Sequence, residues 1–300
     1  MPDLGWNNKL YCTAEEKAEA LGERFYPFTN AKLDDIDTEK VFFVDYSSEQ
    51  AIQTTATTTT EEIQSILMGS RPDKCPGSDG IPNRFLKAMG SALVKMLTKL
   101  INTCLRLSYF PKQFRHACTI VLRKPGKPNY SDPGAWRPIA LLNTLGKILE
   151  TVLARKITDL AESYKLLPNC QMGNRKQRST ETALEFLLEQ IHTAWGLKKV
   201  ASVLLLDIAG AFDTVNHTRL LDNLRIKGIP RWLICIISSF LQQRSTTLVF
   251  DGEEIGPWEL CAGIPQGSPL SPILFLFVRN WHCRMVWVHW LLFVRRESAE

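Results

Sequence analysis

The spacing of apolar residues along the chain predicts a protein of mixed helices and strands. Thr59, followed three residues later by Glu62, offers a capping box that marks the start of the first expected helix. Beyond it, apolar residues recur at the three-to-four-residue period of an amphipathic helix. The expected helices cover a long segment at 86–105, followed by 148–160, 183–191, 217–227 and 232–242.

Short apolar runs bounded by turn residues predict the strands. Residues 117–122 have a β-branched centre, and 200–206 form a continuous apolar run that ends in Asp207. A hairpin is expected where 246–250 and 258–261 flank Asp251-Gly252, because an Asp-Gly pair accepts the backbone angles of a tight turn. The first 60 residues are polar and irregular, so folded structure is expected to begin near Thr59.

Composition agrees with a soluble, intracellular globular protein. Hydrophobic residues make up 45% of the 300 and charged residues 22%. The apolar runs are far shorter than the roughly 18 residues of a membrane span, and no signal sequence is present. The eight cysteines include no Cys-x-x-Cys pair. His282, Cys283 and His289 lack a fourth ligand at a familiar spacing, so no zinc site is expected.

Positive charge is concentrated in one segment. Between Lys112 and Arg178 there are 13 Lys and Arg against 4 Asp and Glu, a balance of +9, whereas the whole chain carries +5. Clustered Lys and Arg favour a polyanionic partner, because they neutralise phosphates and release counterions. A solvated basic surface without such a partner is the alternative.

Two local patterns are candidates for chemistry. A buried strand that ends in Asp207 would hold that carboxylate rigidly, as a Mg²⁺ ligand requires, although a strand-terminal aspartate can also cap the next helix. Residues 263–272 combine three prolines, which stiffen a loop, with two glycines. Gly267 would let the backbone approach a ligand closely, and the alternative is a turn that begins a helix with proline.

Five blocks of sequence, in order, resemble reverse transcriptases of non-LTR retrotransposons. LDIAGAFDTVNHTRLLDNL is similar to motif A, and GIPQGSPLSPILF to motif B. RKPGKPNYSDPGAWRPIALLNTLGKILETVLARKI resembles the fingers motifs, and QMGNRKQRSTETAL the motif after them. DKCPGSDGIPNRFLK, the fifth block, resembles an N-terminal motif of the non-LTR enzymes. In addition to these five, TAEEKAEALGERF resembles a segment that joins an endonuclease to the polymerase in fungal-type elements.

The resemblance implies an α+β fold, the fingers and partial palm of a right-hand polymerase. An antiparallel palm sheet with packed helices is expected, and no thumb. Residues 1–58 would be a connection after an endonuclease, 59–116 an N-terminal helical extension, 117–199 the fingers, 200–278 a partial palm with motifs A and B, and 279–300 an aberrant tail.

The resemblance also implies roles for individual residues. Asp207 would be the catalytic, metal-binding carboxylate, and the carbonyl of Ile208 a further metal ligand. Phe212 would be a steric gate against the 2′-hydroxyl of ribonucleotides, and Asp213 a structural residue. The implied contacts to nucleotide or template are Lys124, Arg137, Lys147, Gln266 and Gly267.

The implied reaction is RNA-templated DNA synthesis with two Mg²⁺ ions, for which Mn²⁺ can substitute. Its partners would be an RNA template, a DNA primer and deoxynucleoside triphosphates (dNTPs), with no membrane. The family implies a nuclear location, with the mitochondrion as the alternative.

The paired aspartates of motif C, which complete the metal site in this family, are not found. No Asp follows Asp251, and after Phe277 the chain is rich in Trp and unlike the family, as a shifted reading frame would produce. Two Mg²⁺ ions need more than one carboxylate, so a truncated, inactive polymerase domain is expected. The alternatives are a non-catalytic RNA- or DNA-binding remnant and an active polymerase. A hydrolase or P-loop enzyme has no supporting motif.

Overall fold

The computed structural model describes residues 1–26, 51–203, 208, 210–278 and, for the backbone alone, 291–295. The helices are α1 (Ala14–Phe25), α3 (Thr60–Gly69), α4 (Asn83–Ala88), α5 (Gly90–Leu107), α6 (Thr144–Ser163), α7 (Thr180–Gly196), α8 (His217–Ile226), α9 (Arg231–Leu241) and α10 (Ser271–Leu276). The strands are β1 (Leu4–Trp6), β2 (Lys9–Tyr11), β3 (His116–Arg123), β4 (Trp136–Leu142), β5 (Lys199–Val203), β6 (Arg244–Phe250), β7 (Glu253–Leu260) and β8 (Leu291–Arg295).

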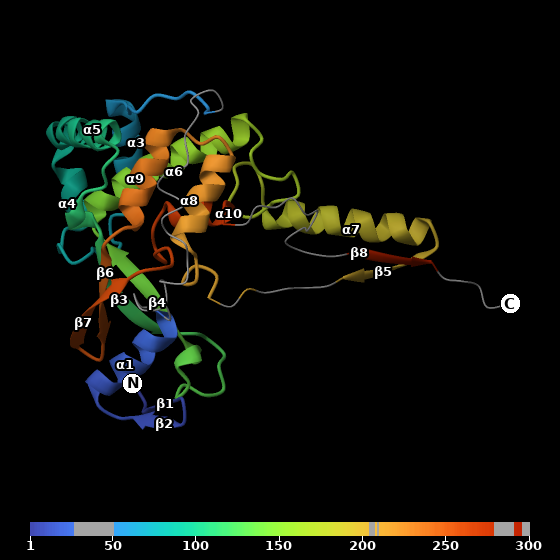
Figure 1. The fold of residues 1–300 in the computed structure, drawn as a ribbon, viewed down its shortest axis with the longest axis horizontal. Helices are drawn as coiled ribbons and strands as arrows, with labels where there is room; N and C mark the ends of the chain where they lie inside the picture. The colour runs from blue at the N-terminus through green and yellow to red at the C-terminus, as the bar shows by residue number, and fades with distance from the viewer. Residues whose placement is uncertain (27–50, 204–207, 209, 279–290, 296–300) are drawn as a thin grey trace.

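Helices and sheet occupy different parts of the molecule. Most helices gather at one end, the four-stranded sheet lies beneath them, and α1 with the β1–β2 hairpin lies at the far end of the sheet (Figure 1). Helix α7 extends to one side together with β5 and β8 (Figure 1). The helical core joins buried residues of α3, α5, α6, α8, α9 and α10 in one cluster, in which Phe110, Leu153 and Phe240 are fully buried.

Several of the helices begin where the sequence provides a side-chain cap. The hydroxyl of Thr59 accepts a hydrogen bond from the backbone N–H of Glu62 at 3.2 Å, and Asn143, Ser179 and Asn216 cap α6, α7 and α8 in the same way. The single long helix expected at 86–105 is wrong, because the chain forms α4 and α5 with a break at Gly90. This glycine has a φ of +65°, a left-handed backbone conformation that separates the two helices.

The main sheet is mixed, with the strand order β4-β3-β6-β7. The pairs β3–β4 and β6–β7 are antiparallel, whereas β3 and β6 run parallel. The expected hairpin is confirmed, with positive φ at both Asp251 (53°) and Gly252 (88°). Two further antiparallel sheets of two strands each pair β1 with β2 and β5 with β8. The α+β fold class is confirmed, while the boundary between fingers and palm stays a prediction.

The expectation that folded structure begins near Thr59 is wrong. Helix α1 has a full capping box between Thr13 and Glu16, and its apolar side packs on the sheet. The buried cluster there contains Leu21 and Phe25 of α1 with Val121 of β3 and Leu248 of β6. The role of this segment as a connection after an endonuclease stays a prediction.

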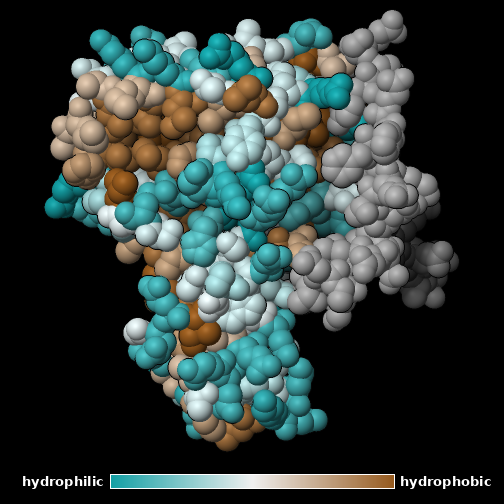
Figure 2. Space-filling model, turned by 60° about the vertical axis from the view of Figure 1, so that its left-hand side comes forward, coloured by the Kyte–Doolittle hydropathy of each residue, from teal (hydrophilic) through white to brown (hydrophobic). Residues whose placement is uncertain are grey.

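Apolar surface gathers on the helical end of the molecule. Figure 2, in which the left-hand side of Figure 1 is turned forward, shows a broad apolar patch above a mainly polar sheet region. Helices α4 and α5, together with Met89 between them, contribute exposed apolar side chains, among them those of Phe85, Met96 and Leu107. Within the described residues, no helix has both the length and the apolar character needed to cross a bilayer.

Candidate active site

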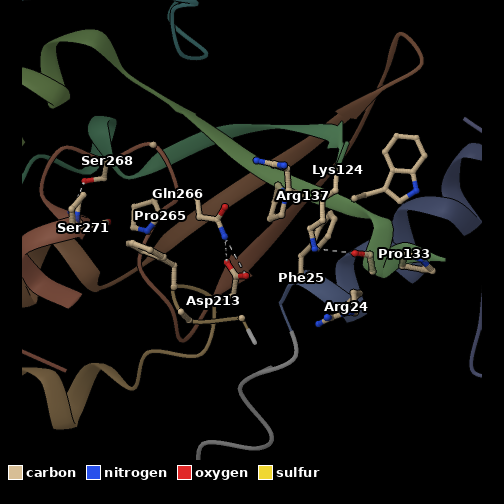
Figure 3. A pocket seen from close by; sticks show the side chains of 18 residues that line it. Arg24, Phe25, Lys124, Pro133, Arg137, Asp213, Pro265, Gln266, Ser268 and Ser271 are labelled. Atoms are coloured by element: carbon tan, nitrogen blue, oxygen red, sulfur yellow. Dashed lines mark hydrogen bonds between the residues drawn. The ribbon is translucent and has the colours of Figure 1, made fainter. Parts of the chain in front are cut away.

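A pocket of about 470 Å³ opens where the four-stranded sheet meets two loops, 210–213 and 265–268. The sheet side supplies Lys124 and Arg137, and the loops supply Phe212, Gln266 and Gly267. These are five of the residues to which the sequence assigned nucleotide or template contacts. Figure 3 shows Lys124 and Arg137 on one side of the opening and Gln266 with Asp213 on the other.

The two loops are joined by backbone hydrogen bonds. The N–H of Gly263 donates to the carbonyl of Val215 at 2.8 Å, and the N–H of Ile264 donates to the carbonyl of Phe212 at 2.9 Å. The Nε2 of His217 donates to the carbonyl of Gly263 at 2.7 Å. These hydrogen bonds hold Phe212 beside the loop that follows Ile264.

The second loop is also tied to α6. The Ser268 hydroxyl donates to the carboxylate of Glu150, a residue with no exposed surface, and accepts from the N–H groups of Leu270 and Ser271. Burial raises the pKa of the Glu150 carboxyl above its ordinary value. This anchor fixes the loop against the helical core.

Gln266 and Asp213 form the polar contact between the loops. The Nε2 of Gln266 donates to Oδ1 of Asp213 at 3.2 Å, and the carbonyl of Gln266 accepts from the N–H of Ala140 at 2.8 Å. Burial raises the pKa of the Asp213 carboxyl, and the Gln266 hydrogen bond and the charges of Arg24 and Lys124 oppose that rise.

Gly267 is placed by close contact with β4. Its φ is +119°, and a Cβ built on it would lie 2.6 Å from the carbonyl oxygen of Ala140. The observed close approach is thus to the neighbouring strand, which brings the loop against the sheet and leaves Gln266 at the pocket wall.

The ring of Phe212 is held by stacking. It lies parallel to the ring of Phe275, with 5.1 Å between ring centroids and 19° between planes. One face of Phe212 is therefore fixed by the helical core, while the residue also lines the pocket.

The pocket wall opposite the loops is basic. The Nζ of Lys124 donates to the carbonyl of Gly134 at 2.9 Å. Burial lowers the pKa of Lys124, and the charges of Arg24, Lys127 and Arg137 lower it further. Arg24, Lys124 and Arg137 therefore act on one another as like charges around one opening.

Comparison with known proteins decides the family. The family model "Reverse transcriptase (RNA-dependent DNA polymerase)" matches residues 122–293, more than half of the chain. The chain belongs to the reverse transcriptase family.

The relatives of this reverse transcriptase come from non-LTR retrotransposons. It is 33% identical over 266 residues to the "Probable RNA-directed DNA polymerase from transposon X-element" of Drosophila melanogaster, covering 87% of this chain and 28% of that protein. It is 29% identical over 274 residues to the RNA-directed DNA polymerase from mobile element jockey of the same species, covering 91% and 30%. The chain thus spans less than a third of the length of these relatives.

The non-LTR assignment is confirmed, and the fungal affinity stays a prediction. The family match continues to residue 293, into the segment 279–300 that we expected to depart from the family. That residues 279–300 depart from the family also stays a prediction.

Lys147 does not join the other expected contacts of this reverse transcriptase. It lies in the first turn of α6, outside the residues that line the pocket. Its charged neighbours are Glu150, Lys74 and Asp79, and burial lowers its pKa. Lys147 is therefore placed to interact with those side chains rather than with the pocket contents.

The expected metal ligands of the reverse transcriptase are not tested by the structure. Asp207 lies outside the described residues, and Ile208 is half-buried. Among the described residues, no group of three or more His, Cys, Asp or Glu side chains could hold a metal ion. Reverse transcriptases depend on divalent metal ions in general, but no reaction step through a metal follows from the residues described here.

Sequence reasoning missed two residues of the pocket wall. Arg24 and Phe25, at the end of α1, line the pocket beside Lys124. The signal for the helix itself was present, because Thr13 and Glu16 form a capping box before apolar residues at helical spacing, but nothing in the sequence indicates that this helix reaches the pocket. That helix was read as part of a connection because its surroundings are polar.

Proposed function

We propose that this chain is the substrate-binding part of a reverse transcriptase domain, which binds an RNA template, a DNA primer and a dNTP. The observation that carries the proposal is the pocket itself, in which Lys124, Arg137, Phe212, Gln266 and Gly267 meet although they lie far apart in the sequence. Its volume of about 470 Å³ is in the range of small-molecule sites.

Each wall of the pocket has chemistry suited to one part of a dNTP. Lys124 and Arg137 are suited to the triphosphate, because arginine offers a fork of donors and lysine a point charge. The fixed ring of Phe212 supports its role as a steric gate that leaves no room for a 2′-hydroxyl. Gln266, held by Asp213 and by Ala140, supplies a rigid wall toward the sugar or template base.

The metal part of the proposal rests on Asp207 and the Ile208 carbonyl as Mg²⁺ ligands, with Mn²⁺ as a substitute. The bound ions would stabilise the attacking and leaving oxygens of nucleotidyl transfer. Because no motif C aspartates were found, we propose that the chain alone does not extend a primer. For its location we propose the nucleus.

Nucleotide binding tests the site. The 300-residue chain is titrated with dCTP and with CTP, which differ only in the 2′-hydroxyl, in the presence of Mg²⁺, and dCTP should bind more tightly. Phe212→Val should reduce this preference, Arg137→Ala should weaken both nucleotides, and Arg106→Ala, at an exposed position of α5, should change neither. Equal binding of dCTP and CTP, unaltered by Phe212→Val, would contradict the proposed gate.

Primer extension tests the proposed inactivity. The chain and its Asp207→Ala variant are incubated with an RNA template, a DNA primer, dNTPs and Mg²⁺ or Mn²⁺. Neither should yield product. Extension by the unaltered chain that disappears in Asp207→Ala would overturn the inactivity and support Asp207 as a catalytic residue.

A further inference from the structure

The N-terminal segment contributes a cation to the pocket. Arg24 lies in the last turn of α1 and is half-buried, and it lines the same opening as Lys124 and Arg137 (Figure 3). Among the described residues, no side chain or backbone group forms a hydrogen bond or ion pair with the guanidinium of Arg24. A half-buried arginine with its donors unused is suited to a ligand that supplies acceptors.

Several contacts hold α1 in place. Leu21 and Phe25 are buried against the sheet, and a Cβ on Gly22 would lie 3.3 Å from Nε1 of Trp258, so that this helix face and β7 are in close contact. Directly after the helix, the hydroxyl of Tyr26 donates to Oγ1 of Thr119 at 3.3 Å. Arg24 therefore projects from a fixed helix, which reduces the entropy lost when it binds a ligand.

The charges around the pocket are unbalanced. Among the described residues that line the opening, the three cations Arg24, Lys124 and Arg137 meet one carboxylate, that of Asp213, whose pKa is raised by burial. Like charges brought together repel one another, and a polyanion that binds between them relieves the repulsion while accepting their hydrogen bonds.

We propose that Arg24 is a third ligand of the nucleotide triphosphate, supplied by an N-terminal helix that lies outside the family match at residues 122–293. This inference rests on the proposed function, because it assigns Arg24 to the same nucleotide site. It makes α1 a part of the substrate pocket and not a connection.

The geometry favours a triphosphate over the backbone of a template. A triphosphate concentrates several negative charges in one small group, whereas a nucleic-acid strand presents one charge per nucleotide, spaced about 3.4 Å apart along the axis. The three cations come from three separate elements and surround one pocket of small-molecule volume. A groove that tracks a strand would place its cations in a row instead.

The test compares ligands that differ in phosphate content. The full chain is titrated with dTTP and Mg²⁺, with inorganic tripolyphosphate and with thymidine. Arg24→Met keeps the apolar stem and removes the charge, and it should weaken dTTP and tripolyphosphate about 10-fold or more without affecting thymidine. Arg24→Lys should recover part of the loss, and Arg106→Ala should bind all ligands as the unaltered chain does. Thermal unfolding without ligand checks that each variant is folded.

The outcomes separate this inference from the proposed function. If Arg137→Ala weakens dTTP but Arg24→Met does not, the role of Arg24 is wrong and the nucleotide site stands. If Arg24→Met weakens an RNA–DNA duplex but not dTTP, Arg24 contacts the nucleic-acid backbone and the inference is overturned. If the unaltered chain binds neither dTTP nor tripolyphosphate, the proposed function fails and the inference fails with it.

Discussion

The side-chain amide of Gln266 donates to both carboxylate oxygens of Asp213, at 3.2 Å and 3.4 Å. This contact joins the loop at 265–268 to the loop at 210–213 at the wall of the pocket. Asp213 was expected to be a structural residue, and the contact gives it a physical task, which is to hold Gln266 in one orientation. Burial of the Asp213 carboxylate is unfavourable, and the hydrogen bonds from Gln266 offset part of this cost. Gln266 is therefore expected to matter for the stability of the fold.

The first prediction concerns this pair. Gln266→Leu leaves the Asp213 carboxylate without its donor and should lower the free energy of unfolding by about 1 to 3 kcal/mol. Adding Asp213→Asn, which removes the unpaired charge, should recover part of the loss. Urea unfolding of the two single variants and the double variant gives the coupling energy. Fully additive effects would show that the hydrogen bond contributes nothing.

The second prediction concerns the close approach at Gly267. Gly267→Ala forces a Cβ to within 2.6 Å of the Ala140 carbonyl at a φ of +119°, so the loop must move away from β4. Gly252→Ala is the matched control, because Gly252 also has a positive φ, of +88°, but its Cβ would meet no atom within 4 Å.

Both substitutions should cost about 1 to 3 kcal/mol of backbone strain, and Gly267→Ala should cost about 1 to 3 kcal/mol more for the clash. Thermal and urea unfolding measure the difference. Nucleotide binding should also weaken in Gly267→Ala, because Gln266 moves with the loop. Equal losses of stability in the two variants would mean that the Ala140 contact is unimportant.

The sequence predicted well those elements whose signal is local. The hairpin at Asp251-Gly252 and the helix that begins after Thr59 depend on turn and cap chemistry that lies within a few residues. The break at Gly90 could not be predicted from the sequence, because the helical spacing of apolar residues continues through it. The left-handed φ of this glycine leaves no trace in that spacing.

Only the part of the candidate site that lies in local motifs could be predicted from the sequence. The resemblance identified Lys124, Arg137 and Gln266, which the structure brings to one pocket. It could not find Arg24, because that residue reaches the pocket through the packing of α1 on the sheet, a long-range contact that neither period nor motif encodes. Lys147 is the opposite case, because the resemblance assigned it a contact but the structure places it outside the pocket. Its position in a motif does not determine in which direction its side chain leaves the helix.

The third prediction concerns pH and His217. Burial lowers the pKa of His217 below its ordinary 6.5, and the positive charge of Arg244 lowers it further, while the bond to the Gly263 carbonyl acts in the opposite direction. The folded state therefore binds fewer protons than the unfolded state between the folded pKa and 6.5. His217 should thus destabilise the protein progressively as the pH falls below about 6.5.

His217→Gln separates this effect from that of other titrating groups. Glutamine can still donate to the Gly263 carbonyl but does not titrate, so the variant should lose less stability than the unaltered chain between pH 7 and pH 5. Urea unfolding across that range measures the difference. A constant difference between the two proteins at every pH would show that His217 does not titrate on unfolding.

The last prediction concerns nucleic-acid binding by the basic segment between Lys112 and Arg178. If phosphates are neutralised there, the affinity for an RNA–DNA duplex should fall steeply with salt and show little sequence preference, because each neutralised phosphate releases counterions. Filter binding across a salt series gives the slope. Affinity that is unchanged between low and moderate salt would remove the electrostatic argument.

Single substitutions then locate the surface within that segment. Arg137 lies at the pocket, whereas Lys147 lies among Glu150, Lys74 and Asp79 in the first turn of α6. Arg137→Ala should therefore reduce the salt slope by about one ion for each phosphate contact it makes, and Lys147→Ala should change the slope less. A larger effect at Lys147 would place the nucleic acid on the α6 side of the molecule and would separate the template path from the nucleotide pocket.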